Sequence, residues 1–112
     1  MAEWVKKLPK PIGIMVSDDR SGQLILDATR ALGLIVPKDV AVIGVGNDEI
    51  FCNLCSPALS SVSTNAVRIG YEAASLLSKR MSGRKKVVRR VVIKPNGIVA
   101  RRSTRAITAA HG

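Results

Sequence analysis

Carboxylate and amide side chains gather in three short polar stretches of this sequence, each of which follows a run of apolar residues. Such side chains can make two directed hydrogen bonds to a pair of neighbouring hydroxyl groups, which suits a sugar. The candidate ligand-binding residues are Asp18, Asp19, Asn47, Asp48 and Asn65. The alternative role for each is to cap the helix that follows, because a polar side chain there can accept hydrogen bonds from the unpaired amides of a first turn.

Two cysteines, Cys52 and Cys55, have the C-x-x-C spacing that occurs in zinc sites and redox centres. Zinc would need two further ligands, but the sequence has no second such pair, and its one histidine, His111, stands at the extreme end. A thioredoxin-like centre would need the pair to open a helix after the first strand, and the surrounding residues do not indicate that setting. We expect two reduced thiols, no metal site and no cofactor.

The residue sets that catalysis would need are missing. His111 lies in an unpatterned tail, so a Ser–His–Asp set cannot be assembled. Asp18 and Asp19 are adjacent and would point in different directions, whereas paired catalytic carboxylates act across a cleft. Gly44 and Gly46 follow an apolar run as in a dinucleotide fingerprint, but the third glycine is absent. We therefore expect no enzyme.

The elements that must hold these residues alternate between short apolar runs and helical stretches, which is typical of a parallel sheet with crossover helices. We predict strands at residues 12–17, 40–45 and 60–64, helices at 21–32 and 66–81, and a loop or short helix at 46–58. The predicted fold class is α/β, an open, mostly parallel sheet with helices on both faces. Ligands bind such sheets beyond the carboxyl ends of the strands, where the candidate residues lie.

The last third of the chain changes character. Residues 87–94 and 98–104 are strand-like and are joined by Pro95-Asn96-Gly97, which favours a tight turn. We therefore predict a β-hairpin-like ending, either a β-hairpin or two strands at a bend. Residues 105–112 have no pattern and are expected to form an unstructured tail.

The length of 112 residues leaves room for one compact unit, and we assign residues 1–104 to it. Residues 3–8 look like the last turns of a helix, which in such folds normally follows a strand. We therefore expect the unit to be incomplete at its N-terminal side. Its uncovered first helix should then drive the formation of a homodimer or make the chain partly unstable.

The formal charge of +10 favours binding to polyanions. The basic residues concentrate in the second half with few aromatic residues to stack on bases, so a solvated surface and an accessory surface for nucleic acid or an acidic partner both remain open. The apolar runs are far shorter than the roughly 20 residues of a membrane-spanning helix, and residues 1–11 lack the apolar stretch of a secretory signal. We expect a soluble cytoplasmic protein with no membrane partner.

Six stretches of the chain carry a family resemblance when taken together. They are Pro11-Ile-Gly-Ile-Met with Ser17-Asp18-Asp19, Gly33-Leu-Ile-Val-Pro-Lys-Asp-Val40, Ala41-Val-Ile-Gly-Val45, Leu59-Ser-Ser-Val62, Ile69-Gly-Tyr-Glu-Ala-Ala74 and Val99-Ala-Arg-Arg-Ser-Thr104. The chain resembles the effector-binding domain of lac- and galactose-repressor-type transcription regulators, a fold shared with type I periplasmic sugar-binding proteins. Trp4 and residues 47–49 and 69–74 look most like the xylose operon regulators among them.

The resemblance implies a two-lobed domain that closes on a monosaccharide, with this chain as most of the C-terminal lobe. Asp18 and Asp19 fall where the family places a ligand-contacting polar pair, and Asn65 falls at a further position on the cleft lip. One departure matters, because the family commonly has an acidic residue where this chain has Gly46. Losing that carboxylate removes one or two charge-assisted hydrogen bonds, each worth roughly 1.5–3 kcal/mol; Asn47 or Asp48 is the candidate substitute.

The function implied is an effector-sensing lobe of a transcription regulator that controls sugar-utilisation genes, with a pentose such as xylose as the effector. Operator DNA would be bound only through a helix-turn-helix module that is absent from this chain, because the helix predicted at residues 21–32 has no second, recognition helix after it. Two alternatives stay open: a sugar-binding protein of a transport system, and a self-associating domain without a ligand.

Overall fold

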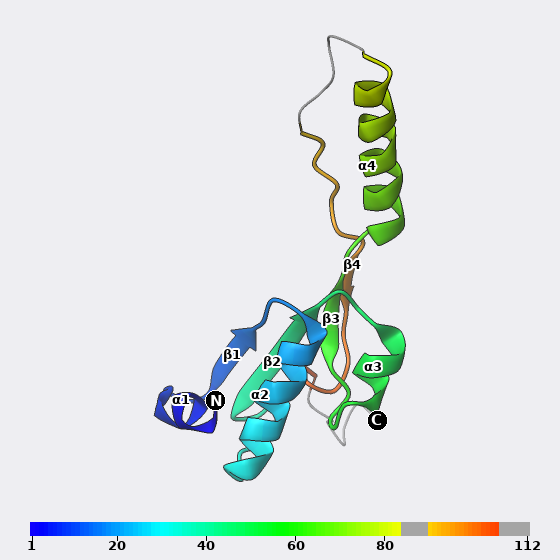
Figure 1. Ribbon diagram of the computed structural model, residues 1–112. Coiled ribbons are helices and arrows are strands. Elements are labelled where there is room, and N and C mark those ends of the chain that lie inside the picture. Colours follow the sequence, from blue (N-terminus) through cyan, green and yellow to red (C-terminus); the bar gives the residue numbers. More distant parts are fainter. Residues whose placement is uncertain (84–89, 106–112) are drawn as a thin grey trace.

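The computed structural model describes residues 1–83 and 90–105, which form four helices and four strands (Figure 1). The helices are α1 (Ala2–Lys7), α2 (Asp19–Ala31), α3 (Glu49–Leu54) and α4 (Ala66–Met81), and the strands are β1 (Ile12–Met15), β2 (Val40–Val45), β3 (Ser60–Ser63) and β4 (Gly97–Val99). The predicted strand at 40–45 and helix at 66–81 are confirmed with their bounds. Residues 87–89 of an expected strand and 106–112 of the expected tail lie outside the described residues.

The strands make one sheet in the order β1-β2-β3-β4. β1 and β2 pair in parallel, from Ile12 opposite Val40 to Met15 opposite Ile43, and β2 and β3 also pair in parallel. β4 alone is antiparallel, beside β3. The predicted α/β class with an open, mostly parallel sheet is confirmed. Because β1, β2 and β3 run in the same direction, their carboxyl ends share one edge of the sheet.

The core lies between the sheet and α2. Val40 and Val42 of β2 are fully buried, and Ile25 and Leu26 of α2 are almost wholly buried in the same apolar cluster. α1 packs beside α2 and buries Val5 there. Full burial of an aliphatic side chain contributes about 1.5–3 kcal/mol, so these contacts hold α2 against the sheet and fix the position of its first residue, Asp19.

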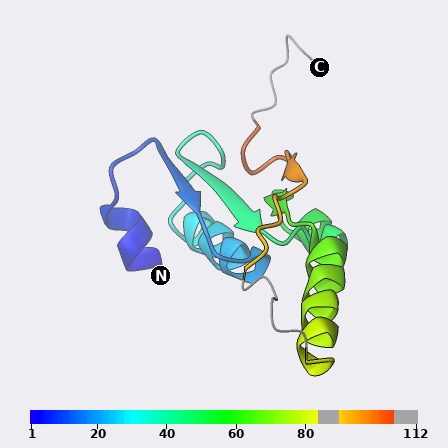
Figure 2. The same cartoon turned by 90° about the horizontal axis from the view of Figure 1, so that it is seen from above.

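The two faces of the sheet are covered unequally. β2 alternates between buried and half-buried residues, so Val42 is buried whereas Ala41 and Ile43 on the opposite face are half-buried. Met15, which pairs with Ile43, is exposed. In residues 1–83 and 90–105, α2 therefore packs on the face that carries Val40 and Val42 (Figure 2), and Ala41 and Ile43 on the opposite face stay half-buried.

α4 and residues 90–96 form an arm that extends away from the sheet (Figure 1). α4 has 16 residues, and none of them is buried. The radius of gyration is 18.5 Å, whereas a compact chain of this length would have about 13 Å. The arm therefore extends the chain well beyond the sheet and α1 to α3. Within the described residues, none of the helices is long and apolar enough to span a bilayer.

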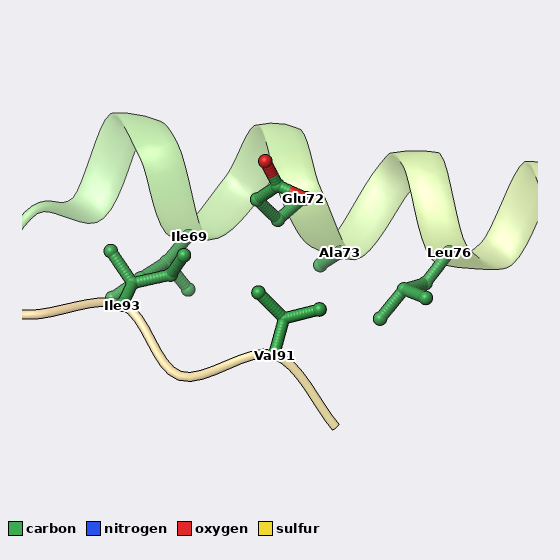
Figure 3. Close-up of a pocket in the computed structure, with 6 residues that line it drawn as sticks. All are labelled: Ile69, Glu72, Ala73, Leu76, Val91 and Ile93. Atoms are coloured by element: carbon green, nitrogen blue, oxygen red, sulfur yellow. The ribbon is translucent and has the colours of Figure 1, made fainter. Parts of the chain in front are cut away.

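The predicted antiparallel ending is confirmed, but the partner of its last strand is β3 and not residues 90–94. The described residues 90–96 form no strand, and β4 takes β3 as its antiparallel partner, with Val62 opposite Ile98. The amide of Asn96 donates to the carbonyl of Ser63 at 2.8 Å, so the turn residues lead the chain directly onto the free edge of β3. Val91 and Ile93 instead lie along α4, where they line a cavity of about 300 Å³ (Figure 3).

Candidate functional site

The parallel sheet brings the first two polar stretches together at its carboxyl edge. The backbone amide of Asp48, after β2, donates to Oδ2 of Asp19, after β1, at 2.8 Å. The amide of Asn47 donates to Oγ of Ser61 in β3 at 3.0 Å, and that hydroxyl donates to Oδ1 of Asp19 at 2.5 Å. Three of the five candidate residues, Asp19, Asn47 and Asp48, are therefore joined at this edge, and Asp18 precedes Asp19 in the chain.

Asp18 and Asp48 fulfil the capping alternative. Oδ1 of Asp18 accepts from the amide of Ser21 at 2.7 Å and begins α2, and Oδ1 of Asp48 accepts from the amide of Phe51 at 3.1 Å and begins α3. The Ser21 amide, followed by the Ser21 hydroxyl, lowers the pKa of the Asp18 carboxyl. Both side chains are exposed at the same edge, so each is oriented by its helix and faces solvent, as a ligand contact requires.

Asp19 differs from its neighbour because its side chain is buried, at 7% exposure. Both carboxylate oxygens have partners, Oδ1 from Ser61 and Oδ2 from Asp48. An ideal Cβ at position 44 would lie 2.5 Å from Oδ1, so the glycine in β2 makes space for this carboxylate. The sequence places Asp19 at the site, and the structure adds that it faces inward.

Asn47 is held by a residue that sequence reasoning missed. Oδ1 of Asn47 accepts from the guanidinium of Arg101 at 2.8 Å, and the same guanidinium donates to the carbonyl of Leu59 at 2.9 Å. Asn47 has a φ of 55°, a left-handed conformation that asparagine adopts more readily than most residues. Nothing local to Arg101 in the sequence signals this role, since its partner lies 54 positions away.

Asn65 immediately precedes α4 and makes no side-chain capping hydrogen bond. It follows β3, so it belongs to the same end of the parallel strands as the other candidates. Among the hydrogen bonds of the described residues, none joins its side chain to the other four. Asn65 is thus at the expected edge without being tied to the network.

The two cysteines lie beneath this edge as free, buried thiols in and after α3. Burial raises the pKa of the Cys52 thiol to about 11, and the charge of Asp19 adds to the rise. Burial also raises the pKa of Cys55. Residues 1–83 and 90–105 contain no group of three or more side chains arranged to hold a metal ion.

Known proteins are similar to this chain along most of its length. Residues 1–104 match the family model described as a periplasmic binding protein-like domain. The xylose operon regulatory protein of Escherichia coli K12 is 35% identical over 104 residues, which are 93% of this chain and 26% of that protein. The chain therefore spans about a quarter of the length of the curated relatives it matches.

Two solved structures share the fold. One, described as a xylose-binding transcription activator, has 33% identity and a TM-score of 0.78 over 97% of this chain and 29% of its own. The other, a complex of the transcriptional regulator CelR with cellobiose, has 31% identity and a TM-score of 0.71 over 81% of this chain and 27% of its own. The resemblance to sugar-responsive transcription regulators is confirmed, and the chain belongs to the periplasmic binding protein-like domain family.

Proposed function

We propose that this chain is the effector-sensing C-terminal lobe of a transcription regulator for sugar-utilisation genes, and that its effector is a monosaccharide, a pentose such as xylose. The observation that carries the proposal is the hydrogen bond from the Asp48 amide to Asp19, which joins two polar loops at the carboxyl edge of a parallel sheet. The names of the relatives, a xylose operon regulatory protein and a xylose-binding activator, support a pentose.

Asp18, Asn47, Asp48 and Asn65 are the residues we propose to contact the sugar, with Asp19 beneath them in the same site. The exposed carboxylates of Asp18 and Asp48 stand at the starts of α2 and α3, and each has a second oxygen that can accept from sugar hydroxyls. Gly46 has no side chain, so the carboxylate that the family commonly has at this position is replaced by that of Asp48.

A sugar held between this lobe and a second lobe would favour the closed arrangement of the two. Such a population shift changes the geometry of a DNA-binding module only if the sugar prefers one state over the other. Operator binding then resides in a helix-turn-helix module outside this chain, in a cytoplasmic homodimer without catalytic activity. The relatives are transcription regulators and not enzymes, which supports this assignment.

The experiment is a calorimetric titration of the whole protein that carries this chain with xylose, other pentoses and cellobiose. We expect saturable heat with a pentose. The variant Asp48→Asn keeps a helix cap but loses the charge, and a charge-assisted hydrogen bond exceeds a neutral one by about 1 kcal/mol or more, so affinity should fall about tenfold. The matched control is Asp27→Asn, the same chemical change at an exposed position of α2, and it should leave the affinity unchanged.

A self-associating domain without a ligand is the second candidate function. The observation in its favour is the arm, in which Val67 is 87% exposed and Leu77 is 60% exposed. Absence of heat for every sugar, together with concentration-dependent association of the chain, would support this candidate and contradict the first.

A further inference from the structure

The loop between β2 and α3 is held through its backbone amides. The amide of Gly46 donates to the carbonyl of Val62 at 2.9 Å, as in an extended strand ladder. The next two amides donate to side chains instead of strand carbonyls. The amide of Asn47 donates to the Ser61 hydroxyl at 3.0 Å, and the amide of Asp48 donates to the Asp19 carboxylate at 2.8 Å. Since Ser61 itself donates to Asp19, both amides depend on one carboxylate, the second directly and the first through Ser61.

The carboxylate of Asp19 is buried and closely packed. Asp19 is 7% exposed and Ser61 is fully buried. The carboxylate lies against two glycines, with an ideal Cβ 2.5 Å from Oδ1 at Gly44 and 3.5 Å from Oδ2 at Gly46. Swinging it out would leave the hydroxyl of Ser61 and the amide of Asp48 without their acceptor, and an unpaired buried polar group is costly.

The positions of the Asn47 and Asp48 side chains depend on these hydrogen bonds of their backbone amides. Asn47 adopts φ 55°, and its Oδ1 is fixed by Arg101. Asp48 directs its Oδ1 to the first turn of α3. A shift of the two amides would move both side chains together.

We propose that Asp19 is a positioning residue of the sugar site: its buried carboxylate fixes the backbone of Asn47 and Asp48 and so sets sugar affinity through their side chains, without itself contacting the sugar. This inference rests on the proposed function for its consequence in sugar binding. The effect of Asp19 on the backbone of Asn47 and Asp48 can be measured without any sugar.

The first test is amide hydrogen exchange in the 112-residue chain. In Asp19→Ala, exchange at Asp48 should accelerate about tenfold or more and exchange at Asn47 should also rise, while the amides of the β1–β2 ladder keep their rates. Asp19→Asn should restore most of the protection, because its carbonyl can accept from Asp48 and its amide can donate to the Ser61 hydroxyl. Unchanged exchange at Asp48 in a folded Asp19→Ala chain would overturn the proposal.

Ser61→Ala provides a second variant in case Asp19→Ala fails to fold. It removes the acceptor of the Asn47 amide but leaves that of the Asp48 amide. We expect faster exchange at Asn47 with Asp48 still protected. Equal acceleration at both amides, or at neither, would contradict the separate connections to Asp19. Asp27→Ala in the exposed part of α2 is the control and should change neither amide.

The second test is sugar affinity in the whole protein that carries this chain. Asp19→Ala should weaken pentose binding about tenfold or more, and Asp19→Asn should stay within about threefold of the original affinity. If Asp19→Asn lost as much as Asp19→Ala, the carboxylate would be a direct charged ligand and the positioning role would be wrong. Absence of binding in the unsubstituted protein would instead contradict the proposed function and leave the exchange result to stand.

Discussion

Among the single residues, Asp19 at the carboxyl edge of the sheet also affects the pKa values of the two buried thiols. Cys52 has no exposed surface, and burial, with the charge of Asp19 next in importance, raises its pKa to about 11 from an ordinary value of 9.0. A thiol with such a pKa is protonated at neutral pH and is a poor nucleophile. Both cysteines belong to the buried apolar cluster.

The raised pKa of Cys52 makes the stability of the folded chain decrease at alkaline pH. The folded chain keeps the Cys52 proton up to about pH 11, whereas the unfolded chain releases it near pH 9.0. The free energy of unfolding should therefore be fully retained below pH 9.0 and should fall as the pH rises from there towards 11. Urea unfolding at several pH values, compared with Cys52→Ala, measures this part of the fall; equal slopes for the two chains would contradict it.

At the scale of elements, β2 accommodates the carboxylate because it has a glycine at position 44. A methyl group there would lie 2.5 Å from Oδ1 and 3.2 Å from Cα of Asp19. Gly13 in the neighbouring strand β1 has nothing within 4 Å of the same position. The two glycines thus have different roles, although both lie in parallel strands.

Gly44→Ala should destabilise the chain by about 1–3 kcal/mol through overpacking and should accelerate exchange at Asp48 as Asp19→Ala does. Gly13→Ala is the matched control and should be neutral or slightly stabilising, since alanine loses less backbone entropy than glycine. Urea unfolding checks both. Equal effects of the two substitutions would show that the space at Gly44 does not matter.

The elements that the sequence predicts well are those whose signals are local. β2 is recognised from its own apolar run, and α4 from its helically spaced apolar residues and the glycine that follows it. The parallel pairing follows from the alternation of strands and helices along the chain. The antiparallel ending was predictable but its partner strand was not, because the turn residues 95–97 are compatible with several partners and α4 separates β4 from β3 in the sequence. The roles of Ser61 and Arg101 were not predictable, because their partners are 42 and 54 positions distant.

At the scale of the whole molecule, the arm is the feature that a compact lobe does not explain. The arm contributes to the longest dimension of the chain, which is 58 Å. Apolar side chains of α4 are exposed from one end of the helix to the other. Exposed apolar surface of this kind favours association in water. The similarity to the xylose-binding activator covers 97% of this chain.

The isolated 112-residue chain should therefore self-associate in a concentration-dependent way. Leu77→Glu, which places a charge on the exposed face of α4, should shift it towards monomer. The matched control is Gln23→Glu, which adds the same charge at an exposed position of α2 and should have no effect. Sedimentation velocity over a range of concentrations distinguishes these outcomes, and a stable monomer of the unsubstituted chain would contradict the expectation.

The central claim is that the loops at the carboxyl edge of the sheet form half of a sugar site. The most direct measurement is a titration of the ¹⁵N-labelled protein with xylose, followed by amide chemical shifts. We expect saturable shifts at Asp18, Asp19, Asn47, Asp48 and Asn65, with the amides of α1 unaffected. Shifts confined to the arm, or no shifts at any concentration of pentose, would contradict it.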